Sequence, residues 1–278
     1  MKFRYTVEEL EALDIRQFEV KKRVRLGGMS IQDALDETQA MLDKTRKPKA
    51  QQVLDLHSYP IWWVSCREQI AKVKDFMELN GCCAPIPAFP LDFEPQTPTE
   101  VPLLAVYLSD RLGIGGIQRT FDAWWKFIEA PKGFDKYTWE GFSSDAEHLK
   151  LIPDETKPDK IRKQHSGARW VGFDPNANRG ISVRSCWEKA SNNTLLQLTG
   201  SEVLMAAKLF PDWVSMLGTG DCPNPNMAGY QFKYSTNWGT TPYMDLTTVG
   251  GLNLLRVCVD NKIDTKNYGW ACPTVRGL

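Results

Sequence analysis

Apolar positions in the first eighty residues recur at the three- and four-residue spacing of amphipathic helices. Thr6 and Glu9 form a capping-box pattern, in which each side chain can accept a hydrogen bond from the other's backbone N–H, and this pattern opens a first helix. The glycine pair 27–28 ends that helix, and Ser30 begins a second one with an apolar face. Two consecutive helices are therefore predicted here.

A third helix is predicted from the same kind of signal. Ser65 and Glu68 form its capping box, Val73 lies on its apolar side, and Asn80-Gly81 supplies a helix stop. Together the three helices predict a helical subdomain over residues 1–83.

A proline-rich segment follows. Between residues 84 and 102 there are six prolines, at positions 85, 87, 90, 95, 98 and 102. Proline fixes φ and lacks a backbone donor, so this run excludes a helix and favours an extended connector. We therefore place the domain boundary at residues 84–102, with a second domain over residues 103–278.

After the connector, an uninterrupted apolar run at 103–108 predicts a buried strand. Glycines follow at 113–116, and then Trp124 and Trp125 lie among aromatic residues at helical spacing, which predicts a helix that packs into the core. A strand, glycines and a helix also suggest a phosphate-binding loop. However, the glycine spacing fits neither phosphate-binding pattern and no Lys-Ser or Lys-Thr follows, so we expect a plain turn.

The remaining segments predict loops, one helix and short strands. Residues 131–167 are polar and interrupted by prolines, which favours long loops with short helical turns. A helix is expected to begin near Ser201 and to end before Pro211, whereas residues 222–278 show almost no helical period. Residues 103–278 are therefore predicted to form a mixed α+β domain with a small twisted antiparallel sheet.

Asp174, Asn176 and Asn178 alternate in a segment that follows a predicted strand. This spacing begins a calcium-binding loop, but Arg179 stands where that loop needs a glycine, and Ser185 where it needs a bidentate glutamate. Asn and Asp side chains also stabilise turns by hydrogen bonds to the backbone. The pattern favours such a turn, without a tightly bound metal or a cofactor.

Composition limits the choice of partner and compartment. The 34 Lys and Arg residues balance 34 Asp and Glu residues, so net charge does not favour a nucleic acid or an anionic membrane. Seven cysteines without a Cys-x-x-Cys pair, and three histidines, argue against a zinc site or a disulfide framework. No segment reaches the roughly 18 apolar residues of a membrane span, and no signal segment is recognised. A cytoplasmic protein is the default expectation, with packaging in a virion or non-classical export as alternatives.

The segment between Gly251 and Cys272 mixes charged, thiol, β-branched and amide side chains without the alternation of a half-buried strand. A glycine pair precedes it, and an aromatic-rich strand ends it. This arrangement suggests a rigid frame that presents a varied set of exposed side chains, as ligand-binding loops do on a scaffold.

Three motifs within residues 165–278 match one family. Residues 198–202, which lead into an alanine-containing helix, resemble a Leu-Pro-Thr-Glu-Ala-Glu-Trp helix, and Val249-Gly250-Gly251 resembles an Arg-Gly-Gly turn. Residues 255–270 resemble the last pair of strands, which carry an arginine, an aspartate and an aromatic-Gly-aromatic step. These motifs resemble the formylglycine-generating-enzyme branch of C-type-lectin-like proteins, and within it the variable proteins of diversity-generating retroelements.

This resemblance has departures as well as implications. No tryptophan follows the glycine pair, no Gly-Phe-Arg ends the chain, and the copper-binding cysteine pair has no counterpart, so sulfatase-activating chemistry is not implied. What is implied is a C-type-lectin-like fold over residues 103–278 and a non-enzymatic protein that binds a macromolecule, expected to be a protein. The variable, ligand-contacting positions would be Asn253, Arg256, Cys258, Val259, Lys262, Ile263, Thr265, Lys266, Tyr268 and Trp270. The supporting positions, buried or hydrogen-bonded, would be Leu254, Asp260, Asn267 and Gly269.

An enzyme of undetermined class is one alternative. Asp174 with His148 or His165 could form an acid and base pair. Cys258 or Cys272 could act as a nucleophile. No sequence spacing brings these residues together, and an unaccompanied cysteine is more often inert.

A phage or mobile-element protein is the other alternative, in which the N-terminal helices bind DNA or a partner protein. Basic residues cluster at 21–25 and 44–49. Without interleaved aromatic residues, such clusters are more typical of solvated helix ends than of a nucleic-acid-binding surface.

Overall fold

The computed structural model describes residues 59–89, 93–112, 114–152, 166–192, 197–260 and 263–278. The chain divides into two compact units, Met1–Ser58 and Tyr59–Leu278, and the described residues all lie in the second unit. The first two predicted helices, His165 and Lys262 fall outside the described residues.

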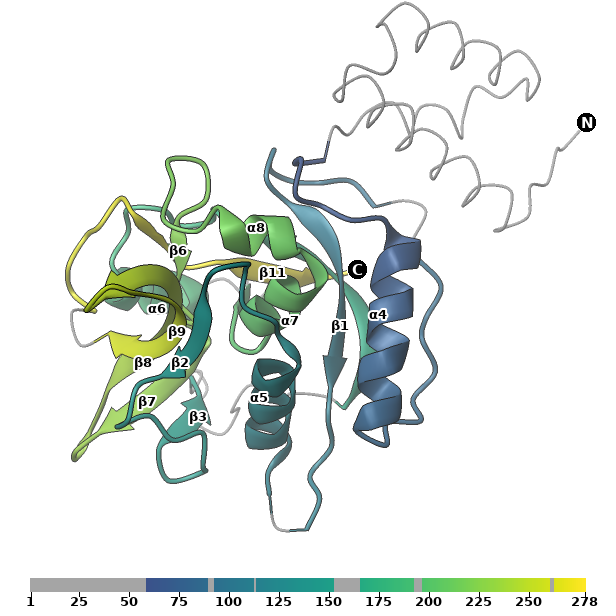
Figure 1. The fold of residues 1–278 in the computed structure, drawn as a ribbon, viewed down its shortest axis with the longest axis horizontal. Coiled ribbons are helices and arrows are strands. Elements are labelled where there is room, and N and C mark those ends of the chain that lie inside the picture. Colours follow the sequence, from purple (N-terminus) through teal and green to yellow (C-terminus); the bar gives the residue numbers. More distant parts are fainter. Residues whose placement is uncertain (1–58, 90–92, 113, 153–165, 193–196, 261–262) are drawn as a thin grey trace, which may run out of the picture. The chain divides into compact units, whose positions relative to one another are not determined.

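Helices and strands are interspersed in the first part of the described unit, and only strands follow the last helix (Figure 1). In chain order they are α4 (Cys66–Leu79), β1 (Val101–Tyr107), α5 (Gly116–Phe127), β2 (Asp135–Thr138), β3 (Leu149–Leu151), β4 (Gly167–Asp174), α6 (Val183–Asn192), β5 (Gln197–Leu198), α7 (Glu202–Leu209), α8 (Pro211–Ser215), β6 (Asn224–Pro225), β7 (Tyr230–Tyr234), β8 (Asn237–Val249), β9 (Leu252–Asp260), β10 (Trp270–Ala271) and β11 (Thr274–Gly277).

Most of the strands pair in two sheets. One sheet has the order β1-β4-β11-β5 and is antiparallel throughout. The other has the order β2-β9-β8-β7-β3, and only β2 and β9 are parallel in it. β6 and β10 form a short parallel pair. The prediction of a mixed α+β fold with antiparallel sheet is confirmed, with two larger sheets in place of one small sheet.

Residues 131–167 differ from the prediction of loops with short helical turns. This segment contains β2 and β3, which pair with β9 and β7. Both partner strands lie far along the chain, so no local sequence pattern reveals the pairing.

The third predicted helix, α4, begins and ends as its sequence signals indicate. The Ser65 side chain accepts a hydrogen bond from the Glu68 backbone, and the Glu68 side chain accepts one from the Ser65 backbone. The helix ends before Gly81, whose φ of +61° lies in the left-handed region that glycine adopts without strain.

Helix α4 belongs to the same core as β1, which is the edge strand of its sheet (Figure 1). The fully buried Gln69 side chain donates a hydrogen bond to the Pro102 carbonyl and accepts one from the Leu104 N–H. Gln69 therefore satisfies backbone groups that an open sheet edge would leave unpaired. The compact unit begins at Tyr59, and not within the proline-rich segment 84–102 where the sequence placed the boundary.

Helix α5 also packs against β1, and its aromatic side chains contact α4 directly. The fully buried Trp124 ring stacks on Phe76 of α4, with 3.7 Å between ring centres, and donates a hydrogen bond to the Val106 carbonyl. Trp124 thus confirms the expected core role, whereas Trp125 is half-buried and donates to the Thr138 hydroxyl.

Helix α7 is buried along almost its whole length and ends before Pro211 as predicted. Ser201 precedes it, but the Ser201 hydroxyl is hydrogen-bonded to the Tyr230 hydroxyl and forms no cap with the helix backbone. Glu202, which is 1% exposed, accepts hydrogen bonds from the Tyr107 hydroxyl at 2.8 Å and the Gly200 N–H at 2.7 Å. These bonds join the start of α7 to the end of β1.

Candidate ligand-display site

A long hairpin, β8 and β9, leads into the predicted ligand-contacting residues. Its two turn residues, Gly250 and Gly251, have φ values of +59° and +83°. A two-residue hairpin turn of this type needs left-handed backbone at both positions, which explains the glycine pair. The turn fixes a register that places Arg256 opposite Asp245 and Cys258 opposite Tyr243.

Arg256 is held by an ion pair and is only partly accessible. Its guanidinium donates two hydrogen bonds of 2.8 Å to the two carboxylate oxygens of Asp245, and the side chains are 25% and 7% exposed. Hydrogen bonding to Asp245 raises the pKa of Arg256. The prediction that Arg256 is mostly accessible is therefore wrong, because the buried Asp245 carboxylate needs this partner.

Three further predicted contact residues, Cys258, Val259 and Trp270, are half-buried. The Trp270 ring meets the Tyr243 ring edge to face, with 4.6 Å between ring centres. Burial, followed by the hydrogen bond with Cys258, raises the pKa of Tyr243. Cys258 and Trp270 therefore lie against Tyr243, whereas Val259, the next residue of β9, is on the opposite face of the sheet and packs against the main core.

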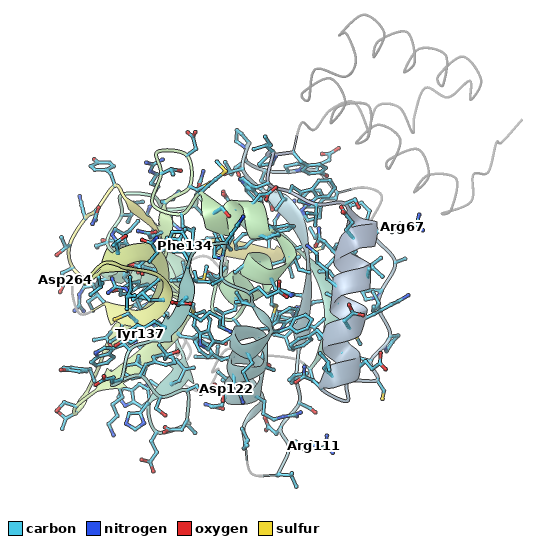
Figure 2. All side chains as sticks on the ribbon, viewed as in Figure 1. Arg67, Arg111, Asp122, Phe134, Tyr137 and Asp264 are labelled. Atoms are coloured by element: carbon cyan, nitrogen blue, oxygen red, sulfur yellow. The ribbon has the colours of Figure 1, made fainter. Side chains whose placement is uncertain are left out.

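The exposed part of the site is the segment 264–268, which we call the display segment. Asp264, at the outer edge of the described unit in Figure 2, forms an ion pair with Arg184. Thr265, Lys266 and Tyr268 are exposed as predicted, and Tyr268 reaches 77% exposure. Asn253, near the hairpin tip, is also exposed and accepts a hydrogen bond from the Thr248 hydroxyl.

Ile263 corrects the sequence prediction. It was expected to be accessible, but it is only 4% exposed and packs in a small apolar cluster with Val183 and Cys186 of α6. Its carbonyl also accepts a hydrogen bond from Arg184 N. An aliphatic side chain beside an apolar helix face is more stable buried than in water, so Ile263 anchors the start of the display segment.

Among the predicted supporting residues whose side chains the structure describes, Asn267 and Gly269 are hydrogen-bonded, as expected. The Asn267 side chain accepts a hydrogen bond from Gly269 N at 2.9 Å, and the Asn267 carbonyl accepts one from Trp270 N. Leu254 is half-buried. Asn267 and Gly269 therefore fix the turn that ends the display segment.

From Tyr268, the last residue of the display segment, to Pro273, every backbone carbonyl accepts a hydrogen bond. Each carbonyl accepts a bond from a distant segment: Tyr268 O from Arg179 Nε, Gly269 O from Asn224 N, Trp270 O from Gly180 N, Ala271 O from Asn226 N, Cys272 O from Asn178 Nδ2 and Pro273 O from Thr199 N. Every residue type has a carbonyl, so these bonds do not depend on which side chains the segment carries.

Asp174, Asn176 and Asn178 form a turn, as predicted. Asp174 accepts hydrogen bonds from the Thr99 hydroxyl and the Asn176 N–H, and Asn178 has a left-handed φ of +55°. The sequence did not reveal that this turn also supports the display segment through Asn178, Arg179 and Gly180. Their partners are main-chain carbonyls about ninety residues away, which leave no local signal.

The residues considered for catalysis have other neighbours. His148 Nδ1 lies 2.7 Å from Asp145 Oδ1, and the Asp174 carboxylate accepts hydrogen bonds from two threonine hydroxyls. Cys272 is fully buried beside Cys186, with which it forms a hydrogen bond that lowers the pKa of Cys186. Cys258 is half-buried against Tyr243.

Within the described residues, no three His, Cys, Asp or Glu side chains gather as possible metal ligands. None of the helices described is both long and apolar enough to cross a membrane.

Comparisons with protein-family models, with curated proteins and with solved structures found no match for the chain. The interpretation of the site therefore depends on its own geometry.

The buried thiol of Cys222 gives a prediction about the pH dependence of stability. Burial raises the pKa of its thiol from 9.0 to about 11, with a smaller contribution from Asp221. The folded protein therefore holds this proton more tightly than the unfolded chain, and the resulting stability is present below pH 9 and is lost as pH rises to about 11. We expect denaturant titrations at pH 8 and pH 11 to show a smaller loss of stability in Cys222→Ala than in the parent chain. An equal loss in both would contradict the assignment.

Proposed function

We propose that the protein is a non-enzymatic binding protein whose display segment, with the half-buried residues Cys258, Val259 and Trp270, contacts a macromolecular ligand. We further propose that the described unit is C-type-lectin-like and that its C-terminal face is diversified by a retroelement. The motifs behind this resemblance lie on α7, on the turn of the β8–β9 hairpin, and on β9 and β10.

The observation that carries the proposal is the separation between backbone support and side-chain display. The carbonyls after the display segment are held by main-chain atoms and by the turn at 176–180, while Thr265, Lys266 and Tyr268 point into solvent. A surface of this kind can change its side chains at little cost to folding, because exposed substitutions usually alter stability by no more than about 0.5 kcal/mol.

Exposure distinguishes among the contact positions that we propose. Thr265, Lys266, Tyr268 and Asn253 are the exposed members, whereas Ile263 is buried and Arg256 is engaged with Asp245. Few interface residues usually carry most of the binding energy, and tyrosine is among the most frequent of them. Tyr268 is accordingly the first candidate for a central contact.

Sequencing the DNA around the gene tests retroelement diversification directly. We expect a reverse-transcriptase gene and a near-copy of the coding end that differs from it at adenines in the codons for residues 253–270. If differences occurred equally at all bases, or if the codons of Ile263 and Asp245 varied as freely as those of the exposed residues, the proposal would fail.

A stability measurement tests the separation of display from folding. The triple variant Thr265→Ala, Lys266→Ala, Tyr268→Ala is expected to lower the melting temperature by less than about 4 °C, because each exposed change costs little. The control Ile263→Ala, in the same stretch of chain, is expected to lower it by roughly 10 °C, because it leaves a cavity in a buried cluster. A triple variant less stable than the control would show that the display side chains are part of the folded core.

A further inference from the structure

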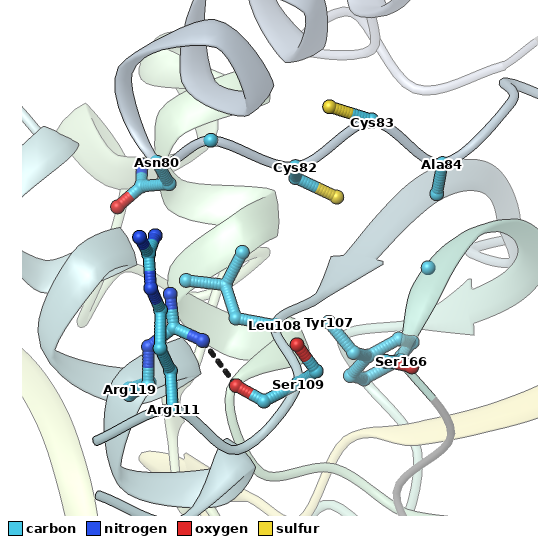
Figure 3. A pocket seen from close by; sticks show the side chains of 12 residues that line it. Asn80, Cys82, Cys83, Ala84, Tyr107, Leu108, Ser109, Arg111, Arg119 and Ser166 are labelled. Carbon is cyan, nitrogen blue, oxygen red and sulfur yellow. Dashed lines mark hydrogen bonds between the residues drawn. The ribbon is translucent and has the colours of Figure 1, made fainter.

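A pocket of about 240 Å³ lies away from the display segment, where four parts of the fold meet (Figure 3). Its walls come from the end of α4 and the residues after it, the exit of β1, α5, and the start of β4. The lining residues are Asn80 to Ala84, Tyr107 to Ser109, Arg111, Arg119, Ser166 and Gly167. In Figure 2, Arg111 and Asp264 lie at clearly separate edges of the unit, so this pocket and the display segment are different surfaces.

Two guanidinium groups share the pocket, and no aspartate or glutamate lines it. By contrast, three other arginines form ion pairs with carboxylates: Arg256 with Asp245, Arg276 with Glu100 and Arg184 with Asp264. Arg119 donates a hydrogen bond to the Ser109 carbonyl (Figure 3), which is a neutral partner. The pocket therefore concentrates positive charge that its own walls do not balance.

Capping of α4 does not account for Arg111. The helix has no basic residue in its last turn, and Arg111 reaches the vicinity of Gly81, so a role at the helix end is the obvious alternative. However, three of the last four carbonyls already have local donors: Phe76 O accepts from Asn80 N, Met77 O from Cys82 N and Glu78 O from Gly81 N. Asp110, the neighbouring carboxylate, accepts a hydrogen bond from Gly116 N at the start of α5.

We propose that this pocket binds a small oxyanion, the phosphate or carboxylate group of a compact metabolite, through Arg111 and Arg119. Guanidinium groups form strong, charge-assisted hydrogen bonds with both kinds of anion. The Ser109 and Ser166 hydroxyls at the pocket wall are further donors. A volume below the roughly 300–1,000 Å³ of drug-sized sites limits the ligand to a small molecule.

Cys82 and Cys83, which also line the pocket, provide a reporter of the charge. The anionic reagent iodoacetate should alkylate these thiols faster, relative to neutral iodoacetamide, than it alkylates the half-buried Cys66 outside the pocket. In the double variant Arg111→Gln, Arg119→Gln, this preference for iodoacetate should fall by about fivefold or more. Mass spectrometry of the tryptic peptides separates Cys66 from the pair Cys82 and Cys83, which share one peptide.

Titration calorimetry with inorganic phosphate and with succinate tests binding and distinguishes the two anion classes. We expect at least one of them to bind with a dissociation constant below about 1 mM, and the double variant to bind it at least about tenfold more weakly. The control Arg67→Gln removes an exposed arginine from the other end of α4 and should leave anion binding in the calorimetric titration unchanged. The exposed Arg111→Gln alone gives the same test should the double variant fail to fold.

Binding of neither anion at about 10 mM, or equal binding by the parent chain and the double variant, would overturn the proposal. Tighter binding of phosphate would assign the pocket to phosphorylated ligands, and tighter binding of succinate to carboxylates.

Discussion

A chain shortened to residues 59–278 is expected to fold and to melt in one cooperative transition, whereas a chain shortened to residues 84–278 is expected not to fold. The shorter chain lacks α4 and the residues before it, which contribute Trp62, Trp63, Val73, Phe76 and Met77 to the core. Burial of one large apolar side chain contributes about 1.5–3 kcal/mol, so the loss of five approaches the whole stability of about 5–15 kcal/mol of a typical domain.

Loss of Gln69 adds to this effect, because the Leu104 N–H and the Pro102 carbonyl on the edge of β1 would lose their partner. Circular dichroism and near-ultraviolet melting curves of the two chains provide the measurement. Within the longer chain, Phe76→Ala should lower the melting temperature by roughly 10 °C, and the exposed neighbour Asp75→Ala by less than about 2 °C. A folded 84–278 chain with an unchanged melting temperature would restore the domain boundary to the proline-rich segment.

Local sequence signals predicted the ends of helices and turns well. The capping box at Ser65 and Glu68, the stop at Gly81, the break before Pro211 and the glycine-pair turn all appear where expected. Each of these depends on contacts within a few residues, which the sequence order itself supplies.

The assignment of α4 to a domain failed for a physical reason. An apolar helix face shows that a helix packs against something, but it does not identify the partner. The partner is β1, which begins at the end of the proline-rich segment. Gln69 joins the two elements by hydrogen bonds, and the burial of this polar residue is not revealed by any periodicity of the sequence.

In the candidate site, too, local sequence patterns predicted some environments correctly and tertiary partners decided others. The exposure of Thr265, Lys266 and Tyr268 followed from the irregular, polar pattern of the segment. Ile263 and Arg256 belong to the same pattern, yet one fills a cluster on α6 and the other neutralises Asp245 across the hairpin. Tertiary partners decide the environment of such residues, and a single sequence does not contain them.

Replacement of Glu202 is expected to produce the other large effect. Glu202 is 1% exposed at the start of α7, and its two carboxylate oxygens accept hydrogen bonds from the Tyr107 hydroxyl and the Gly200 N–H. The Arg169 guanidinium lies 4.6 Å from the centre of the Tyr107 ring. Burial acts to lower the pKa of Arg169, but Tyr107 and Glu202 outweigh it, and the pKa rises. Glu202 thus helps to balance a partly buried positive charge.

Glu202→Ala would leave the Tyr107 hydroxyl and the Gly200 N–H without this acceptor, and Arg169 without this negative charge. A buried donor left without its acceptor costs about 1–3 kcal/mol, so the loss of both bonds corresponds to roughly 10 °C in the melting temperature of a unit of this size. Glu129→Ala is the matched control, because Glu129 also pairs with a residue of α7, Lys208, at 2.9 Å, but its side chain is 86% exposed. Water replaces an exposed partner readily, so the control should change the melting temperature by less than about 2 °C. Differential scanning calorimetry of the two variants decides between burial and pairing as the source of stability. Equal destabilisation by both substitutions would show that the buried network around Glu202 does not hold α7 to β1.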